Sequence, residues 1–352
     1  MTARILAVGT AVPEKQYAQK TIQEHCRTGF AGTAAAGRED IFERAGVETR
    51  GLVEAPEYYF SDVPFERRNA DYFRHAEALA RRALESALGQ AGVAIEDLTH
   101  LFSVTTTGLM TPSLDAHLAQ ALPFRRTLKR TPLFGVGCAG GAVALSRAYE
   151  YLRGHPEETI AVLSVELCSL TFLPKDGTMT QLVAAAIFGD GAACVILCGE
   201  KAAAAGRAEF SFVDNESVLI PDSLHVMGWN FGADGMRLVL SNDAPAIVER
   251  NLEDALSPLL ARHGVCVDEL SPLVLHPGSS RILDACERAM GLPDGAAVLS
   301  RAFLKRHGNL SSASVLFILT DALAQPKTAS PWGLLVALGP GFACEALLIR
   351  RS

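Results

Sequence analysis

Short runs of apolar residues alternate along the chain with longer segments in which Ala, Leu, Glu and Arg recur at helical spacing. The apolar runs predict strands, of which the clearest lie at residues 101–105, 159–165, 192–197 and 273–275. The intervening segments predict helices, of which the clearest lie at residues 76–91, 140–153 and 246–262. Strands that alternate with helices are typical of an α/β protein, and strands that are apolar throughout indicate a sheet buried on both faces.

A glycine turn followed by an apolar strand occurs twice in the chain. Gly189-Asp-Gly and Gly339-Pro-Gly each precede such a strand, and both strands carry a cysteine at the same step. The turns at Cys138 and Asn309 likewise each open a helix of small residues. Two copies of one α/β unit explain both repeats.

Length and composition agree with two large halves. The chain has 352 residues, more than one hydrophobic core usually serves, and the repeat divides it into an N-terminal half of residues 1–205 and a C-terminal half of residues 206–352. Apolar residues make up 49% of the chain, which is enough for a large core. The net charge of −7 argues against nucleic acid as a partner.

The sequence also argues against a membrane protein, a secreted protein and a metalloprotein. No apolar run approaches the ~18 residues of a membrane span, and the first apolar segment is interrupted too early for a signal peptide. The eight cysteines are scattered, with neither a CxxC pair nor a His/Cys cluster of zinc spacing, so we expect no metal site. Free thiols and the absence of a targeting signal predict a cytoplasmic location.

Cys138 lies at a predicted strand-to-helix turn, within Gly137-Cys-Ala-Gly-Gly. A thiol at a helix N-terminus faces unpaired backbone N–H groups and the positive end of the helix dipole, which favour the nucleophilic thiolate. The neighbouring glycines allow a substrate to approach closely. The alternative for a lone cysteine at such a turn is a buried core residue.

Two other turns carry residues that complement a thiol. His276 ends a hydrophobic strand just before a Pro-Gly break, and ligands bind at the strand ends of α/β sheets. Asn309 starts a helix, where it would also serve as an N-cap. A Cys–His–Asn set suits covalent acyl transfer, with a thiolate nucleophile, an imidazole and an amide donor for a developing oxyanion. Papain-type proteases use the same residue types in the same order, but the sequence around Cys138 and the repeated halves disfavour a protease.

The chain resembles the type III polyketide synthases, the chalcone synthase-like branch of the thiolase-fold condensing enzymes. The resemblance covers nearly the whole chain and rests on five motifs in family order: Gly137-Cys138-Ala-Gly-Gly, Phe188-Gly-Asp-Gly-Ala-Ala, His276-Pro-Gly-Ser, Gly308-Asn309-Leu-Ser-Ser-Ala and Gly339-Pro-Gly-Phe342. It implies a thiolase-like fold, in which two similar α/β halves form a five-layered αβαβα core. It also implies a homodimeric acyltransferase that uses coenzyme A (CoA) thioesters and needs no cofactor.

The resemblance gives each residue of the constellation a role. Cys138 would carry the starter acyl group, and His276 would keep Cys138 as a thiolate. His276 and Asn309 would together bind the thioester carbonyl during decarboxylation of malonyl-CoA and condensation. A developing enolate needs neutral or cationic donors, which these two side chains supply. Phe188 falls on the family's gatekeeping phenylalanine between the CoA tunnel and the cavity, and Leu238 aligns with a second gatekeeper that is aromatic in plant enzymes.

Further positions follow from the same alignment. The remaining pocket positions are Thr106, Glu166, Cys168, Thr171, Ser311, Gly339 and Pro340, and the expected CoA-binding residues are Arg44, Arg50 and Gly278. In resorcinol-forming members, residues matching Thr106, Glu166 and Ser311 can hold a water that promotes aldol closure. Bacterial tetrahydroxynaphthalene synthases carry a cysteine at the position of Thr106, so the threonine disfavours that activity.

These residues predict an enzyme that loads an aliphatic acyl-CoA starter, extends it with malonyl-CoA and closes the chain to an alkylpyrone or alkylresorcinol. The loss of aromatic bulk at Leu238 favours the aliphatic starter. One alternative is a malonyl-only synthase of the tetrahydroxynaphthalene or dihydroxyphenylacetyl-CoA type, the latter resembled by residues 176–180. Another is a ketoacyl synthase III-like enzyme that condenses once, although His276 lacks its His-Gln-Ala-Asn context. A thiolase-fold interaction protein is disfavoured by the intact Cys–His–Asn set.

Overall fold

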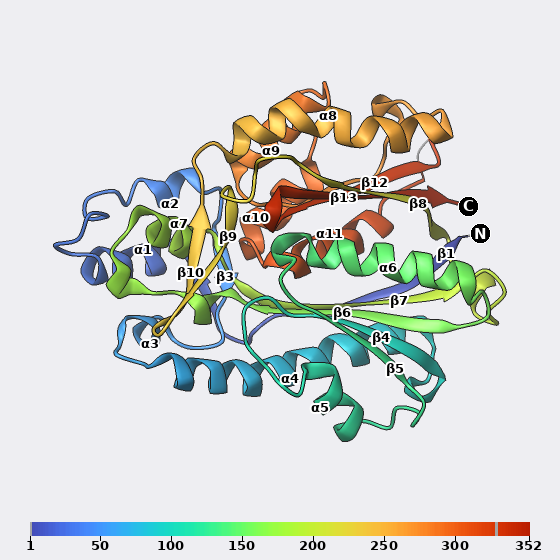
Figure 1. Cartoon of the computed structure of the whole chain (residues 1–352), viewed down its shortest axis with the longest axis horizontal. Coiled ribbons are helices and arrows are strands. Elements are labelled where there is room, and N and C mark those ends of the chain that lie inside the picture. The colour runs from blue at the N-terminus through green and yellow to red at the C-terminus, as the bar shows by residue number, and fades with distance from the viewer. Residues whose placement is uncertain (1, 328–329) are drawn as a thin grey trace.

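The computed structural model describes residues 2–327 and 330–352 and shows five layers, helix–sheet–helix–sheet–helix (Figure 1). Two helices lie between the two sheet layers, and further helices cover the outer faces. The outer helices are α4 (Phe65–Ala91), α5 (Leu114–Ala121), α8 (Ala244–His263) and α9 (Ser280–Ala289), and the central ones are α6 (Gly140–Gly154) and α11 (Ser314–Leu323). This arrangement confirms the predicted α/β class and its αβαβα layering.

The strands form a continuous nine-stranded sheet in the order β11-β12-β13-β8-β1-β7-β6-β4-β5. Their bounds are β1 (Ala3–Ala11), β4 (Leu98–Val104), β5 (Lys129–Leu133), β6 (Thr159–Leu167), β7 (Asp190–Gly199), β8 (Phe210–Leu219), β11 (Leu273–Leu275), β12 (Trp332–Gly339) and β13 (Ala343–Arg351). In the first half β4 runs parallel to β6, which pairs antiparallel with β7. In the second half β11 runs parallel to β12, which pairs antiparallel with β13. The two layers join where the start of β1 pairs with β8.

The sequence repeat corresponds to a structural repeat. β7 and β13 occupy matching places in their halves, as do α6 and α11, each of which follows a short 3-10 turn, Gly137–Ala139 or Ser311–Ala313. The two helices approach closely because α6 opens with two glycines: a Cβ built on Gly141 would clash with the carbonyl oxygen of Ser312. Glycine therefore brings the two repeated turns together in the middle layer.

The predicted elements are present, with one clear difference. Every residue of β7 and all but the first residue of β6 are buried, as a sheet covered on both faces requires. α4 begins at Phe65, well before the predicted start at residue 76. Its first turns carry polar residues in ion pairs, such as Arg67 Nε with Asp71 Oδ2 at 3.0 Å, so the apolar periodicity is absent there.

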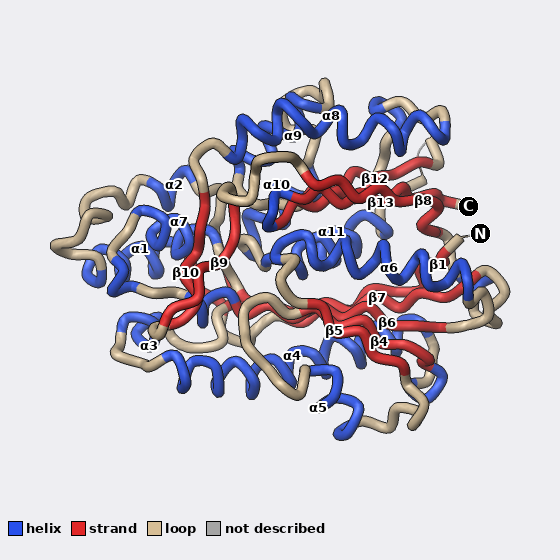
Figure 2. Tube along the Cα trace, viewed as in Figure 1, coloured by secondary structure: helices blue, strands red, loops and turns tan. Residues whose placement is uncertain are grey.

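The remaining elements cluster at one end of the layers, on the left of Figure 2. They are α1 (Gln19–Gly29), α2 (Ile41–Arg44), α3 (Pro56–Phe60), α7 (Met179–Ile187), β2 (Gln16–Ala18), β3 (Thr49–Gly51), β9 (Met227–Gly232) and β10 (Gly235–Leu240), with α10 (Val298–His307) beside α9. Within the described residues, no helix combines the length and the apolar character needed to cross a membrane.

Candidate active site

Cys138 lies in the 3-10 turn Gly137–Ala139 that links β5 to α6. Gly137 adopts φ +46°, a left-handed conformation, and a Cβ on it would clash with the ring of Pro340. Glycine is therefore required there both by backbone conformation and by packing. The turn places Cys138 at the start of a helix, where the residue is buried except for 8% of its surface.

The matching turn in the second half presents Asn309. Its Oδ1 accepts a hydrogen bond from the Ser311 N–H at 2.8 Å, and its Nδ2 donates to the Gly278 carbonyl at 3.3 Å. An amide nitrogen carries two N–H groups, so one remains for a ligand. Ser311 adopts φ +48°, the counterpart of Gly137 in the first turn. For a residue with a Cβ this conformation is strained, and such strain gathers at functional sites.

His276 follows β11, where its backbone N–H donates to the Val336 carbonyl at 2.9 Å. Both ring nitrogens are buried, and neither has a hydrogen-bond partner among the described residues. Buried polar atoms are normally paired, so an unpaired imidazole at this place indicates a group that binds substrate.

Contacts between the three turns bring the predicted residues to one place. Ser311 Oγ lies 3.6 Å from the Cys138 thiol, and the Asn309 side chain is near enough to lower the pKa of that thiol. Gly278, whose carbonyl Asn309 binds, is two residues beyond His276. The candidate nucleophile therefore comes from the N-terminal half and both candidate oxyanion donors from the C-terminal half.

Burial dominates the protonation of Cys138 and His276. It raises the pKa of Cys138 to about 11, although hydrogen bonds from Ser311 and Asn309 act in the opposite direction. It lowers the pKa of His276 to about 3. The prediction that the helix N-terminus lowers the pKa of this thiol is therefore wrong, because the loss of hydration on burial outweighs the effect of the helix. Burial therefore disfavours a charge on either group.

Glu166 lies fully buried next to this centre. Its carboxylate accepts hydrogen bonds from Thr106 Oγ1 at 2.8 Å, Thr107 Oγ1 at 2.8 Å and Ser312 Oγ. Burial raises the pKa of Glu166 to about 7, and these donors hold it below the value that burial alone would give. Thr106 Oγ1 also lies 3.3 Å from Ser311 Oγ. The structure thus brings the expected Thr106, Glu166 and Ser311 together in one network that reaches the Cys138 thiol.

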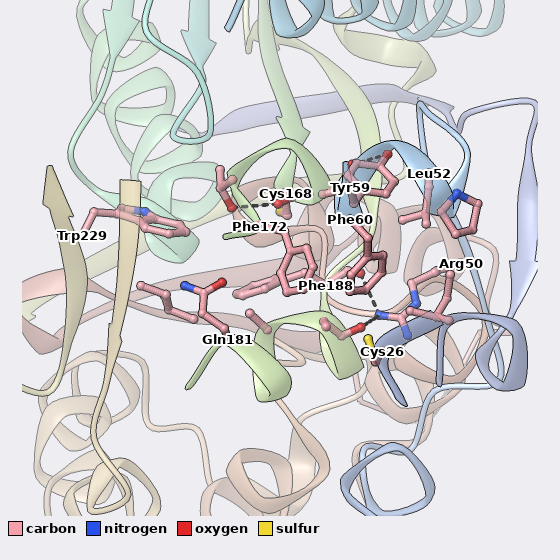
Figure 3. Close-up of a pocket in the computed structure, with 17 residues that line it drawn as sticks. Cys26, Arg50, Leu52, Tyr59, Phe60, Cys168, Phe172, Gln181, Phe188 and Trp229 are labelled. Atoms are coloured by element: carbon pink, nitrogen blue, oxygen red, sulfur yellow. Dashed lines mark hydrogen bonds between the residues drawn. The ribbon is translucent and has the colours of Figure 1, made fainter. Parts of the chain in front are cut away.

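A largely apolar pocket lies on the α7 side of the site (Figure 3). Four predicted pocket residues line it: Cys168, Thr171, Phe188 and Leu238. Residues that the sequence did not single out also line it, among them Tyr59, Phe60, Phe172, Gln181 and Trp229. Trp229 stands opposite Leu238 in the β9–β10 hairpin, so one cross-strand pair closes the pocket at that end.

The other predicted positions fall into two groups. Gly339 and Pro340 pack against the Cys138 turn, where a Cβ on Gly339 would clash with Ala139. Arg44 is exposed and pairs with Asp40.

Arg50 does not have the expected surface position. Its side chain is 1% exposed, and its Nη1 donates to the carbonyl oxygens of Ala185 and Phe188 at 2.7 and 2.9 Å. The expectation that Arg50 binds a CoA phosphate at the tunnel mouth is therefore corrected, because the main chain of α7 holds its guanidinium inside the protein.

Two family models match the chain. "Chalcone and stilbene synthases, N-terminal domain" matches residues 1–201, and "Chalcone and stilbene synthases, C-terminal domain" matches residues 212–352. Together they span both repeated halves, including the turns of Cys138, His276 and Asn309.

Individual relatives agree with the family models. The chain is 41% identical to a 1,3,6,8-tetrahydroxynaphthalene synthase of Streptomyces peucetius subsp. caesius over 98% of this chain and 92% of that one. It is 36% identical to a putative chalcone synthase of Bacillus subtilis (strain 168) over 98% of both chains. The crystal structure of 1,3,6,8-tetrahydroxynaphthalene synthase from Streptomyces coelicolor A3(2) superimposes with a TM-score of 0.91, at 29% identity over 99% of both chains. The chain belongs to the chalcone and stilbene synthase family, the type III polyketide synthases, which are acyltransferases of the condensing type.

Proposed function

We propose that this type III polyketide synthase loads an aliphatic acyl group from a CoA thioester onto Cys138, extends it with malonyl-CoA and closes the chain to an alkylpyrone or alkylresorcinol. The apolar pocket beside Phe188 carries this proposal. Its far end is formed by Trp229 and Leu238, and a hydrocarbon chain buried there gains about 0.8 kcal/mol per methylene.

Loading begins with a proton transfer. His276, which is neutral at neutral pH because burial lowers its pKa to about 3, takes the Cys138 proton as the thiol attacks the thioester carbonyl. The carbonyl π pair moves to oxygen, and the free N–H of the Asn309 amide stabilises the resulting oxyanion. When the carbonyl re-forms, the bond to CoA sulfur breaks, and the departing thiolate takes the proton from His276.

Extension begins with decarboxylation of malonyl-CoA. The bond between the α-carbon and the carboxylate carbon of malonyl-CoA breaks, and CO2 leaves. The electron pair of that bond forms the enolate, with its negative charge on the thioester oxygen. A carboxylate near that oxygen would repel it, whereas Asn309 and a neutral His276 can each donate an N–H. The enolate carbon then attacks the acyl group on Cys138, and the Cys138 thiolate leaves.

The proposal assigns further roles around this chemistry. Phe188 separates the catalytic turn from the apolar pocket, and Arg44 at the surface binds a CoA phosphate. A second copy of the chain completes a homodimer, for which the 49% apolar content gives modest support.

A malonyl-only synthase is the second candidate, and the relatives favour it. Proteins named 1,3,6,8-tetrahydroxynaphthalene synthase match at 41% and 31% identity, and one named 3,5-dihydroxyphenylacetyl-CoA synthase, of Streptomyces toyocaensis, matches at 30%. Thr106, at a position where tetrahydroxynaphthalene synthases carry a cysteine, argues against the first of these activities.

A starter panel separates the two candidates. The enzyme is incubated with malonyl-CoA and acyl-CoA starters from acetyl to palmitoyl, and the products are identified by mass spectrometry. Products whose mass increases with the starter support the aliphatic proposal, whereas malonyl-derived products alone contradict it and support the second candidate. Release of CO2 by wild type, but not by His276→Ala or Asn309→Ala, tests the condensing mechanism shared by both.

A further inference from the structure

The C-terminus of α7 is capped by side chains from a distant part of the chain. The last carbonyl groups of a helix lack partners within the helix and must find them elsewhere. Arg50 Nη1 donates hydrogen bonds to the carbonyl oxygens of Ala185 and Phe188 at 2.7 and 2.9 Å. Gln19 Nε2 donates one to the carbonyl oxygen of Ala186 at 2.9 Å. Gln19 Oε1 in turn accepts a hydrogen bond from Arg50 Nη2. Arg50 and Gln19 thus act as one capping unit, and Figure 3 shows Arg50 beside Phe188.

The remaining carbonyl group of the last α7 turn, that of Ile187, binds the backbone of Asn309 in the candidate active site. Ile187 accepts a hydrogen bond from the backbone N–H of Asn309 at 2.7 Å, and Gly189 donates one to the Asn309 carbonyl at 3.1 Å. These two bonds make an isolated bridge between Phe188 and Asn309. The segment of residues 187–189 therefore holds the main chain of Asn309 and also carries the Phe188 ring that borders the pocket.

The buried charge of Arg50 is stabilised by main-chain carbonyl groups at the end of α7. Its side chain is fully buried and makes no ion pair among the described residues, although the Asp190 carboxylate contributes favourably from a distance. A buried charge without a close counter-ion needs strong hydrogen-bond acceptors, and the negative end of the α7 dipole provides them. The pKa of Arg50, lowered to about 10 by burial, still leaves it charged at neutral pH.

We infer that Arg50 is a positioning residue for the oxyanion donor: by holding the last turn of α7 it fixes the backbone of Asn309, and with it the amide that binds the malonyl enolate. The inference rests on the proposed decarboxylative mechanism. It assigns Arg50 no chemical step, although Arg50 also lines the apolar pocket, and it predicts a larger effect on the steps that depend on Asn309 than on the reactivity of Cys138.

Arg50→Lys tests this role, because the single Nζ of lysine cannot bind both α7 carbonyls and Gln19. We expect the kcat of malonyl-CoA decarboxylation, measured as CO2 release, to fall about tenfold or more with little change in KM. The rate at which iodoacetamide alkylates Cys138 should fall by less than the kcat of CO2 release, because Asn309 is one of several groups that lower the pKa of the thiol but is a direct donor to the enolate.

Arg68→Lys is the matched control. Arg68 is also buried and donates to main-chain carbonyl groups, those of Phe172 and Asp234, but not to the segment that bonds to Asn309. Its substitution should lower the melting temperature to a similar extent while CO2 release stays within about twofold of wild type. Equal losses of CO2 release in the two variants would show a merely structural role and overturn the inference.

Three further outcomes are decisive. If Arg50→Lys does not fold, Gln19→Leu is tested instead, because it removes the hydrogen bond to the Ala186 carbonyl and one partner of Arg50. CO2 release at the wild-type rate in Gln19→Leu would overturn the inference. If wild type releases no CO2 from malonyl-CoA, the proposed function fails and the inference falls with it. If wild type and Arg50→Lys release CO2 equally, the inference alone fails.

Discussion

At the scale of single residues, burial makes Cys138 and His276 depend on each other. Each group alone is held in its neutral form, with the pKa of the thiol raised to about 11 and that of the imidazole lowered to about 3. In the proposed loading step, a thiolate and an imidazolium formed together would attract each other in a poorly hydrated site, an attraction that neither has alone. On this proposal the reactive state is a property of the pair.

The first prediction concerns this pair. In His276→Ala the Cys138 thiol should lose its proton acceptor, so alkylation by iodoacetamide at pH 7 should become much slower than in wild type. The rate in the variant should then rise about tenfold per pH unit with no plateau below pH ~10, because the pKa of the lone thiol is about 11. Equal rates in both proteins at pH 7 would contradict the pairing.

Glu166 gives a second residue-scale prediction. Its pKa is raised from 4.5 to about 7, so the folded protein binds a proton that the unfolded chain releases. Its contribution to stability is therefore complete below pH ~4.5 and is lost as pH rises through about 7, at up to about 1.4 kcal/mol per pH unit.

Denaturant unfolding of wild type and Glu166→Gln between pH 4.5 and 8 checks that slope. The difference in the free energy of unfolding should shift in favour of the variant as pH rises. Asp190, whose pKa is also raised, is present in both proteins and cancels. A difference that is flat with pH would show that Glu166 does not titrate in this range.

At the scale of elements, the β9–β10 hairpin sets one end of the apolar pocket. Trp229 and Leu238 are cross-strand partners, so replacing one changes the space available beside the other. The larger of the two side chains, Trp229, provides most of the bulk at this end.

Trp229→Ala should therefore move the optimum of the starter panel towards longer acyl chains, and Leu238→Phe should move it towards shorter ones. We expect the ratio of kcat/KM for palmitoyl-CoA to that for a short starter to rise about tenfold in Trp229→Ala, the equivalent of about 1.4 kcal/mol. Opposite shifts in the two variants support the hairpin as the boundary. Identical starter preferences in all three proteins would place the boundary elsewhere.

The elements also show what the sequence can predict. Cys138 and Asn309 each follow a glycine that marks a turn, and His276 precedes a Pro-Gly break, so local sequence identifies all three. Trp229 depends on the register of a hairpin, and the burial of Arg50 depends on α7, a helix far away in the chain. Neither is visible in local sequence, which is why one was missed and the other was placed at the surface.

At the scale of the whole molecule, the site exists because two halves pack through their central helices. α6 and α11 approach where Gly141 faces the Ser312 carbonyl, and Ser312 also binds Glu166. Any group added at Gly141 pushes one half away from the other.

Gly141→Ala should accordingly destabilise the protein by about 1–3 kcal/mol and reduce CO2 release from malonyl-CoA. Gly89→Ala is the matched control, because Gly89 lies in helix α4 with open space where its Cβ would be. That variant should be as stable as wild type or more stable by up to about 1 kcal/mol. Thermal unfolding of both variants checks the contrast, and equal stability would show that the interface between the halves can yield.

The paired turns carry one more consequence. Gly137 and Ser311 share a left-handed backbone, so the residue after each occupies the same place in its half: Cys138 in one and Ser312 in the other. The proposed function places the acyl group on Cys138, while the hydroxyl of Ser312 donates a hydrogen bond to Glu166. One backbone turn is thus used twice with different side chains and different partners. Engineering of this enzyme can therefore vary the two positions separately, and neither can be expected to replace the other.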